Sequence, residues 1–197
     1  MKQVLIIHGG ATFPSYEEYL EWLRALKLDD PRERKVRWKS SLGEALGPEY
    51  QVIAPEMPNP SNARYEEWKL WLEKYVPFID DDVTFVGHSL GGLFLAKYLS
   101  ENIFPKKIKS AHFVAAAYTV GIRPHSDFAI SGPIDKIAAQ CQNVFFYHAP
   151  DDPIVSVDEF KKYQVALPSA TFRLLEGRGH FRGETFPEIL ADIKSLS

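Results

Sequence analysis

The chain has 197 residues, of which 45% are hydrophobic and 25% are charged, and such values are ordinary for a globular protein with its own core. Its net charge of −3, with no basic cluster interleaved with aromatic residues, argues against binding to nucleic acid. A locally basic stretch runs from Arg32 to Lys39, and we expect it to be a solvated helix face.

Cysteine content and hydropathy bear on the cellular compartment. Cys141 is the single cysteine, so no internal disulfide can form, and we interpret it as a small packed residue in a reducing environment. No apolar run is long enough to cross a bilayer, and Val4–Ile7 is too short for the core of a signal peptide. We therefore expect a cytoplasmic protein that makes no membrane contact.

Short apolar runs alternate with amphipathic segments along the chain. Strands are expected at 4–7, 50–54, 83–86, 111–115, 144–147 and 171–175. Three helices should begin at Ser/Thr-x-x-Glu capping boxes, which are led by Ser15, Ser156 and Thr185. Further helices are expected over about 33–46, 65–75 and 90–100.

This alternation predicts a fold class. Six strands interleaved with helices are typical of an α/β three-layer sandwich, in which a mostly parallel six-stranded sheet carries helices on both faces. No repeat or linker divides residues 1–197, and we expect a single domain. Function in such sheets gathers at the carboxyl ends of the strands, near a reversal of strand order.

The third expected strand is followed by Gly87-His88-Ser89-Leu90-Gly91. This G-x-S-x-G pattern is typical of a nucleophile elbow, a strained turn that exposes a serine hydroxyl between a strand and a helix. Glycines allow close passage of neighbouring backbone, and the helix N-terminus offers N–H groups to an oxyanion. The pattern is short, but its position between an apolar strand and an apolar helix is where the chemistry requires it. Ser89 is therefore the candidate nucleophile.

The segments after the fifth and sixth expected strands carry a candidate acid and a candidate base. Asp151 and Asp152 come after the fifth expected strand, and His180 comes after the sixth. The order Ser, Asp, His is that of an α/β-hydrolase. His180 would accept the proton of Ser89 and return it to the leaving group, while an aspartate orients the imidazole. Water would then hydrolyse the acyl-enzyme.

The chain resembles the α/β-hydrolase superfamily over nearly its whole length. Within it, the chain is most similar to the small serine hydrolases grouped with retinoblastoma-binding protein nine and the bacterial YdeN-like proteins. The resemblance is carried by the first strand with His8-Gly9, the Ser89 elbow, Asp152-Pro153-Ile154-Val155 and Gly179-His180-Phe181. The superfamily usually starts with two more strands, and the resemblance to this small group implies a fold that begins at the strand before His8-Gly9. The long, charged segment 28–48 departs from the relatives.

The resemblance also implies which aspartate is the acid. Relatives place the acid three residues before a valine, here Val155, and this favours Asp152. Asp151 is then a turn residue, although it remains the competing assignment. If neither aspartate serves, Glu176 at the end of the sixth strand is the next candidate.

Two backbone N–H groups are candidates for the oxyanion hole. Leu90 follows the nucleophile, and Gly10 follows the His8-Gly9 pair, the position that supplies the second donor in the superfamily. Ala11 is the near alternative to Gly10.

Segment 118–135 stands where this fold inserts a lid. It is short and contains Tyr118, Arg123, His125 and Phe128. A short lid leaves the site open to water, which favours small or flexible acyl substrates. Arg123 could meet an anionic substrate group, although a solvated loop arginine is the favoured interpretation.

The remaining histidines and acids favour structural roles. No two histidines have the spacing of metal ligands, and Asp80-Asp81-Asp82 is expected to be a turn, so we expect no metal and no cofactor. The predicted function is hydrolysis of a small ester-like or amide-like substrate by Ser89, Asp152 and His180. Of these two reactions, ester hydrolysis is the favoured one. Two alternatives stay open: a catalytically weak binding protein on this fold, and a non-hydrolytic reaction at the same residues. A small-molecule substrate is the only partner that the sequence indicates.

Overall fold

The computed structural model describes residues 1–28, 30, 32–33, 36–119 and 126–196. Within them, six strands form one sheet in the order β2-β1-β3-β4-β5-β6, and every neighbouring pair is parallel. The predicted α/β class with a mainly parallel sheet is confirmed. The strands are β1 (Lys2–Ile7), β2 (Tyr50–Ile53), β3 (Val83–His88), β4 (Ile108–Val114), β5 (Val144–His148) and β6 (Thr171–Leu174).

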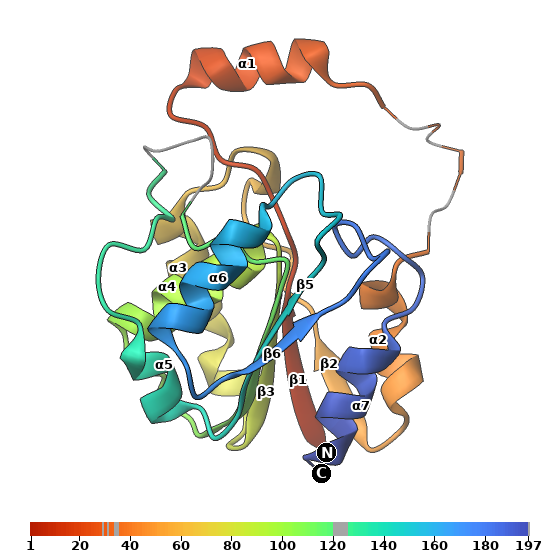
Figure 1. The fold of residues 1–197 in the computed structure, drawn as a ribbon, viewed down its shortest axis with the longest axis vertical. Helices are drawn as coiled ribbons and strands as arrows, with labels where there is room; N and C mark the ends of the chain where they lie inside the picture. The colour runs from red at the N-terminus through yellow and green to blue at the C-terminus, as the bar shows by residue number, and fades with distance from the viewer. Residues whose placement is uncertain (29, 31, 34–35, 120–125, 197) are drawn as a thin grey trace.

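Helices cover both faces of the sheet (Figure 1). One face carries α2 (Trp38–Leu46) and α7 (Pro187–Ser195), and the other carries α3 (Tyr65–Tyr75), α4 (Leu90–Glu101), α5 (Asp135–Gln140) and α6 (Val157–Ala166). Strand β1 shows why both layers are needed. Its alternate side chains Val4 and Ile6 pack toward α2 and α7, while Leu5 and Ile7 pack toward α3 and α4. A strand that is buried on both faces has a continuous apolar sequence, and this pattern predicts the position of β1.

One helix lies outside both layers. Helix α1 (Tyr16–Ala25) lies beyond the carboxyl ends of the strands, above the body of the molecule in Figure 1, and none of its residues is buried. Its predicted cap is present, because the Ser15 hydroxyl accepts a hydrogen bond from the N–H of Glu18 at 3.2 Å. The rings of Tyr19 and Trp22 contact Phe13, with centroids 5.5 and 5.3 Å away.

The other two predicted helix starts have different outcomes. Ser156 is the N-cap of α6, as predicted, and its hydroxyl accepts from the N–H of Asp158, but the Glu159 carboxylate binds Lys162 and does not complete the box. Helix α7 begins at Pro187, which suits a first helical position, and its N-cap is therefore not Thr185. In both cases the glutamate has a cationic partner: Glu159 pairs with Lys162, and Glu188 pairs with Arg178.

Three further expectations differ from the structure. The helix expected from about 33 begins only at Trp38, and α5 was not predicted, because six residues are too few to show a helical period. Phe128 is not a lid residue but lies buried between Trp68 and Phe94 of the α3–α4 layer. Arg123 and His125 lie outside the described residues. Among those that are described, no helix is both long and apolar enough to cross a membrane.

Candidate active site

The predicted site residues meet at one edge of the sheet. The chain runs from β1 outward to β2 and then returns to β3 on the other side of β1, so strand order reverses between β1 and β3. Ser89 directly follows β3, and Gly9 and Gly10 follow β1. The loops after β5 and β6 bring Asp152 and His180 to the same edge, as expected for a parallel sheet with its ligand crevice at the switch point.

Ser89 has the backbone of a nucleophile elbow. Its φ of 57° and ψ of −122° lie in a region that costs a non-glycine residue roughly 1–3 kcal/mol. A hydrogen bond helps to hold this strained conformation, because the Ser89 N–H donates to the Val114 carbonyl at 2.8 Å. A Cβ on Gly91 would stand 2.4 Å from the carbonyl oxygens of Ile7 and His8, so only glycine fits there. The motif glycine therefore allows the first turn of α4 to lie directly against β1.

A continuous chain of hydrogen bonds joins the three predicted residues. The Ser89 hydroxyl lies 2.8 Å from His180 Nε2, and His180 Nδ1 lies 2.8 Å from Asp152 Oδ2. The other carboxylate oxygen accepts the N–H groups of Ile154 and Val155 at 2.8 and 3.0 Å. Burial raises the pKa of Asp152, but hydrogen bonds from His180 and these N–H groups outweigh it and leave the pKa below its usual value. The aspartate is thus an anion that orients the imidazole.

Asp151 points elsewhere and has a different task. Its two carboxylate oxygens accept the N–H groups of Gly177 and Gly179, each at 3.1 Å. These glycines have φ values of 72° and 49°, so the loop that carries His180 makes sharp left-handed turns around the Asp151 side chain. Asp151 is more than the simple turn residue that we expected. Glu176 is exposed and has no hydrogen bond to His180.

The backbone donors beside Ser89 separate the two oxyanion-hole candidates. The Ala11 N–H donates to the Pro60 carbonyl at 2.8 Å and is therefore occupied. The N–H groups of Gly10 and Leu90 make no hydrogen bond with the described residues, and both residues line the cleft with Ser89. Leu90 is the first residue of α4, where N–H groups lack an intrahelical partner and the helix dipole is positive.

His88 connects the elbow to the histidine loop. Its Nε2 donates to the backbone carbonyl of His180 at 2.9 Å, and its Nδ1 accepts from Lys39 Nζ at 3.1 Å. Burial, and then the nearby positive charge of Lys39, holds the pKa of His88 well below its usual value. A neutral imidazole is the form that can accept on one nitrogen and donate on the other. His88 therefore positions the backbone that carries His180.

Three other described histidines make no hydrogen bond to Ser89, Asp152 or His180. His8 accepts from the Met57 N–H at 2.9 Å and braces the loop after β1. Burial lowers the pKa of His112 to about 3, and its ring bonds to Tyr147 inside the sheet. His148 is buried at the end of β5, and neither ring nitrogen has a partner among the described residues. No group of three potential metal ligands occurs within the ranges that the structure describes.

An open cleft of about 1020 Å³ surrounds Ser89 and His180. Part of its wall was not predicted as functional: Trp22 of α1, Arg37, Lys39 and Arg182 all line it. The expected solvated face from Arg32 to Lys39 is therefore wrong at Lys39, which is partly buried against His88, while Arg34 and Lys35 lie outside the described residues. The basic residues are evident in the sequence, but their spacing does not indicate that any of them faces the site.

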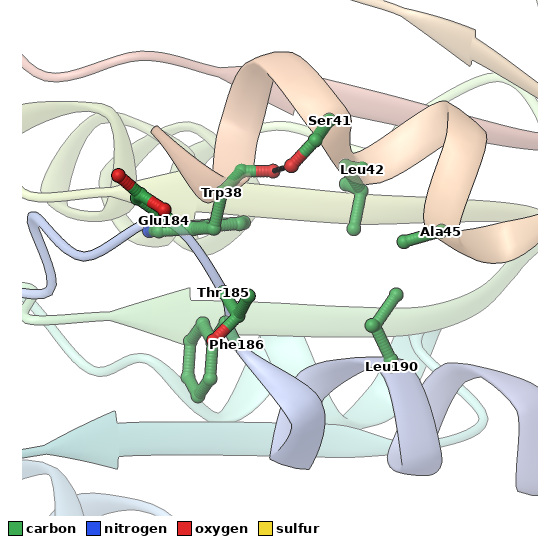
Figure 2. Close-up of a pocket in the computed structure, with 8 residues that line it drawn as sticks. All are labelled: Trp38, Ser41, Leu42, Ala45, Glu184, Thr185, Phe186 and Leu190. Carbon is green, nitrogen blue, oxygen red and sulfur yellow. Dashed lines mark hydrogen bonds between the residues drawn. The ribbon is translucent and has the colours of Figure 1, made fainter. Parts of the chain in front are cut away.

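A second cavity lies between α2 and α7, away from Ser89. Figure 2 shows Leu42 and Ala45 of α2 facing Leu190 of α7 across it. Its volume is about 50 Å³, enough for water but not for an organic substrate. The large cleft is therefore the candidate substrate site.

Comparison with known proteins identifies the family of the chain. The serine hydrolase family model matches residues 32–186. Serine hydrolase RBBP9 of Rattus norvegicus is 24% identical over 149 residues, which cover 76% of this chain and 79% of that protein. The Bacillus subtilis ydeN product has a similar structure, with a TM-score of 0.74 and 20% identity over 100% of this chain and 98% of that one. The esterase domain of a Rhodothermus marinus protein has a TM-score of 0.62 and 15% identity over 99% and 84%. The chain belongs to the serine hydrolase family.

Proposed function

We propose that this protein hydrolyses small ester or amide substrates through an acyl-enzyme formed on Ser89, and that esters are the preferred class. The observation that carries the proposal is the hydrogen-bonded chain from the Ser89 hydroxyl through His180 to Asp152. Membership of the serine hydrolase family supports the same class of reaction. The strained elbow supports it too, because the conformation of Ser89 has no evident purpose other than to expose its hydroxyl.

The geometry suits a two-stage reaction. Ser89 Oγ bonds to the substrate carbonyl carbon while its proton passes to His180 Nε2, and Asp152 stabilises the resulting imidazolium. The N–H groups of Gly10 and Leu90 would hold the oxyanion. Collapse of this intermediate breaks the bond to the leaving group, which takes the proton from His180. Water then attacks the acyl-enzyme by the same route, releasing the acid and restoring Ser89.

Labelling by a fluorophosphonate probe tests the proposal directly. The wild type should gain the mass of one phosphonyl group, and Ser89→Ala should gain none while it unfolds at a similar temperature. Ser61→Ala is the matched control, because Ser61 also lines the cleft but makes no hydrogen bond to His180, whose Nε2 faces Ser89. Equal labelling of Ser89→Ala and wild type would refute the assignment. Para-nitrophenyl esters of graded chain length then measure the acyl preference, for which we expect the short chains to be best.

A further inference from the structure

Three cations line one side of the cleft, and none of them has an acidic partner among the described residues. Arg37, Lys39 and Arg182 share the cleft with Ser89 and His180. The ion pairs among the described residues all involve other cations, so no described carboxylate lies within 4.0 Å of these three. We call Arg37, Lys39 and Arg182 the cationic wall.

The fold holds the cationic wall together against its own repulsion. The backbone N–H of Trp38 donates to the Gly183 carbonyl at 3.0 Å, and the indole N–H of Trp38 donates to the Phe181 carbonyl at 2.9 Å. The Arg37 guanidinium donates to the Arg182 carbonyl at 3.1 Å. These bonds join the start of α2 to the segment that follows His180. Like charges kept adjacent in this way are unfavourable until an anion binds among them.

Lys39 lies deepest in the cationic wall. Burial, and then the charges of Arg37 and Arg182, lowers the pKa of Lys39 to about 8. A lysine ammonium normally avoids such a place, and its one described hydrogen bond, to His88, involves a neutral acceptor. The Lys39 ammonium has three protons, so two remain available to a ligand in the cleft.

The opposite side of the cleft has a different character. Leu93 and Ala117 are apolar, and they belong to the α3–α4 side of the sheet. Glu159 also lines the cleft, but its carboxylate is satisfied by Lys162 and by Thr119. Among the described residues of the cleft, the charge without a partner is therefore positive and lies on the α2–α7 side.

The position of His180 tells which part of a substrate meets the cationic wall. As the proposed general acid, His180 must pass a proton to the leaving atom, so the leaving group lies beside the imidazole. Arg182 follows His180 by two residues, and Lys39 binds His88, whose ring centroid is 5.1 Å from that of His180. We propose that the substrate carries an anionic group on its leaving-group portion, bound by Arg37, Lys39 and Arg182. This inference rests on the hydrolase function proposed above.

Paired esters that differ only in charge test the inference. Para-acetoxybenzoate and its methyl ester release an anionic and a neutral phenol, and their kcat/KM ratio measures the preference for charge. Para-nitrophenyl hydrogen adipate and its methyl ester place the same difference on the acyl portion. The variants are Arg182→Gln, whose side chain is exposed, and the double variant Arg37→Gln with Arg182→Gln. Lys136→Gln, which removes a charge from the exposed face of α5, is the matched control.

We expect the wild type to favour the anionic leaving group. In the double variant, the kcat/KM ratio of para-acetoxybenzoate to its methyl ester should fall about tenfold, which corresponds to about 1.4 kcal/mol. Added salt should reduce the wild-type ratio, and Lys136→Gln should leave it unchanged. An equal ratio in wild type and double variant would overturn the inference, as would a charge preference confined to the adipate pair. If neither neutral ester is hydrolysed and Ser89 takes no label, the proposed function itself fails.

Discussion

The substitution Asp152→Asn preserves the shape of the proposed acid and changes only which atoms can donate. In the wild type, one carboxylate oxygen accepts from Ile154 and Val155, and the other accepts from His180 Nδ1. An asparagine can keep the two backbone hydrogen bonds only if its side-chain oxygen faces the N–H groups of Ile154 and Val155. Its NH₂ group then faces His180 Nδ1 and donates to it.

The structure sets the size of this effect. Turning the amide over would aim NH₂ at two N–H groups and lose two hydrogen bonds of about 1 kcal/mol each, so the donating orientation is favoured roughly thirtyfold. His180 Nδ1 must then accept, and the imidazole proton moves to Nε2, which faces Ser89. That nitrogen can no longer accept the serine proton. The same exchange in the chymotrypsin-type triad costs on the order of 10⁴ in turnover, about 5.5 kcal/mol, and we expect a comparable loss of kcat here.

Hydrolysis of para-nitrophenyl acetate measures the loss, and urea unfolding shows whether the variant is folded. Asp151→Asn is the matched control, because Asp151 binds Gly177 and Gly179 rather than His180. We expect this control to lower the free energy of unfolding by about 1 kcal/mol and to keep kcat within about tenfold of wild type. A folded Asp152→Asn variant with kcat within about tenfold of wild type would refute the reasoning, and so would an equal loss in Asp151→Asn.

Two further predictions concern stability. His112 has a folded pKa of about 3 against 6.5 in the unfolded chain, so the unfolded state binds the proton first on acidification, and the free energy of unfolding should fall by roughly 1.4 kcal/mol per pH unit below about 6. Urea unfolding at pH 7 and pH 5 checks this fall; it should be smaller in His112→Asn, and equal values in the wild type would contradict it. Gly91→Ala should unfold more easily by roughly 3 kcal/mol or more, because its Cβ meets two carbonyl oxygens, whereas Gly132→Ala, with open space around it, should unfold like the wild type. Equal thermal stability of the two alanine variants would show that the elbow tolerates a side chain.

Local pattern predicts the strands of this protein and the meeting of Ser89 with His180 at one edge of the sheet. Strand β3 is a continuous apolar run, and the G-x-S-x-G motif depends on backbone requirements confined to five consecutive positions. Parallel pairing then carries the ends of β3, β5 and β6 to one edge of the sheet. For this reason the sequence alone predicts that Ser89 and His180 lie close together.

Features that depend on contacts between distant loops could not be predicted in this way. The Ala11 N–H is excluded from an oxyanion role only because the Pro60 carbonyl lies 2.8 Å from it, 49 positions further along the chain. Asp151 stands in a segment typical of a turn, and the two N–H groups that donate to its carboxylate belong to the loop after β6, a different strand. Lys39 lies in a run with the charge pattern of a solvated helix, and the Trp38 anchors that turn it toward the cleft involve residues 181 and 183.

The proposed reacting groups and the cationic wall are thus positioned by different means. Strand pairing sets the places of Ser89 and His180, whereas hydrogen bonds from α2 to the segment after His180 set the place of Lys39. The two meet at His88, which accepts from Lys39 and donates to the His180 carbonyl. A bound anion would favour the charged form of Lys39, and a charged lysine must donate to His88. The other nitrogen of His88 then keeps its proton directed at the backbone of His180. The cationic wall and the proposed base are therefore connected through a single imidazole.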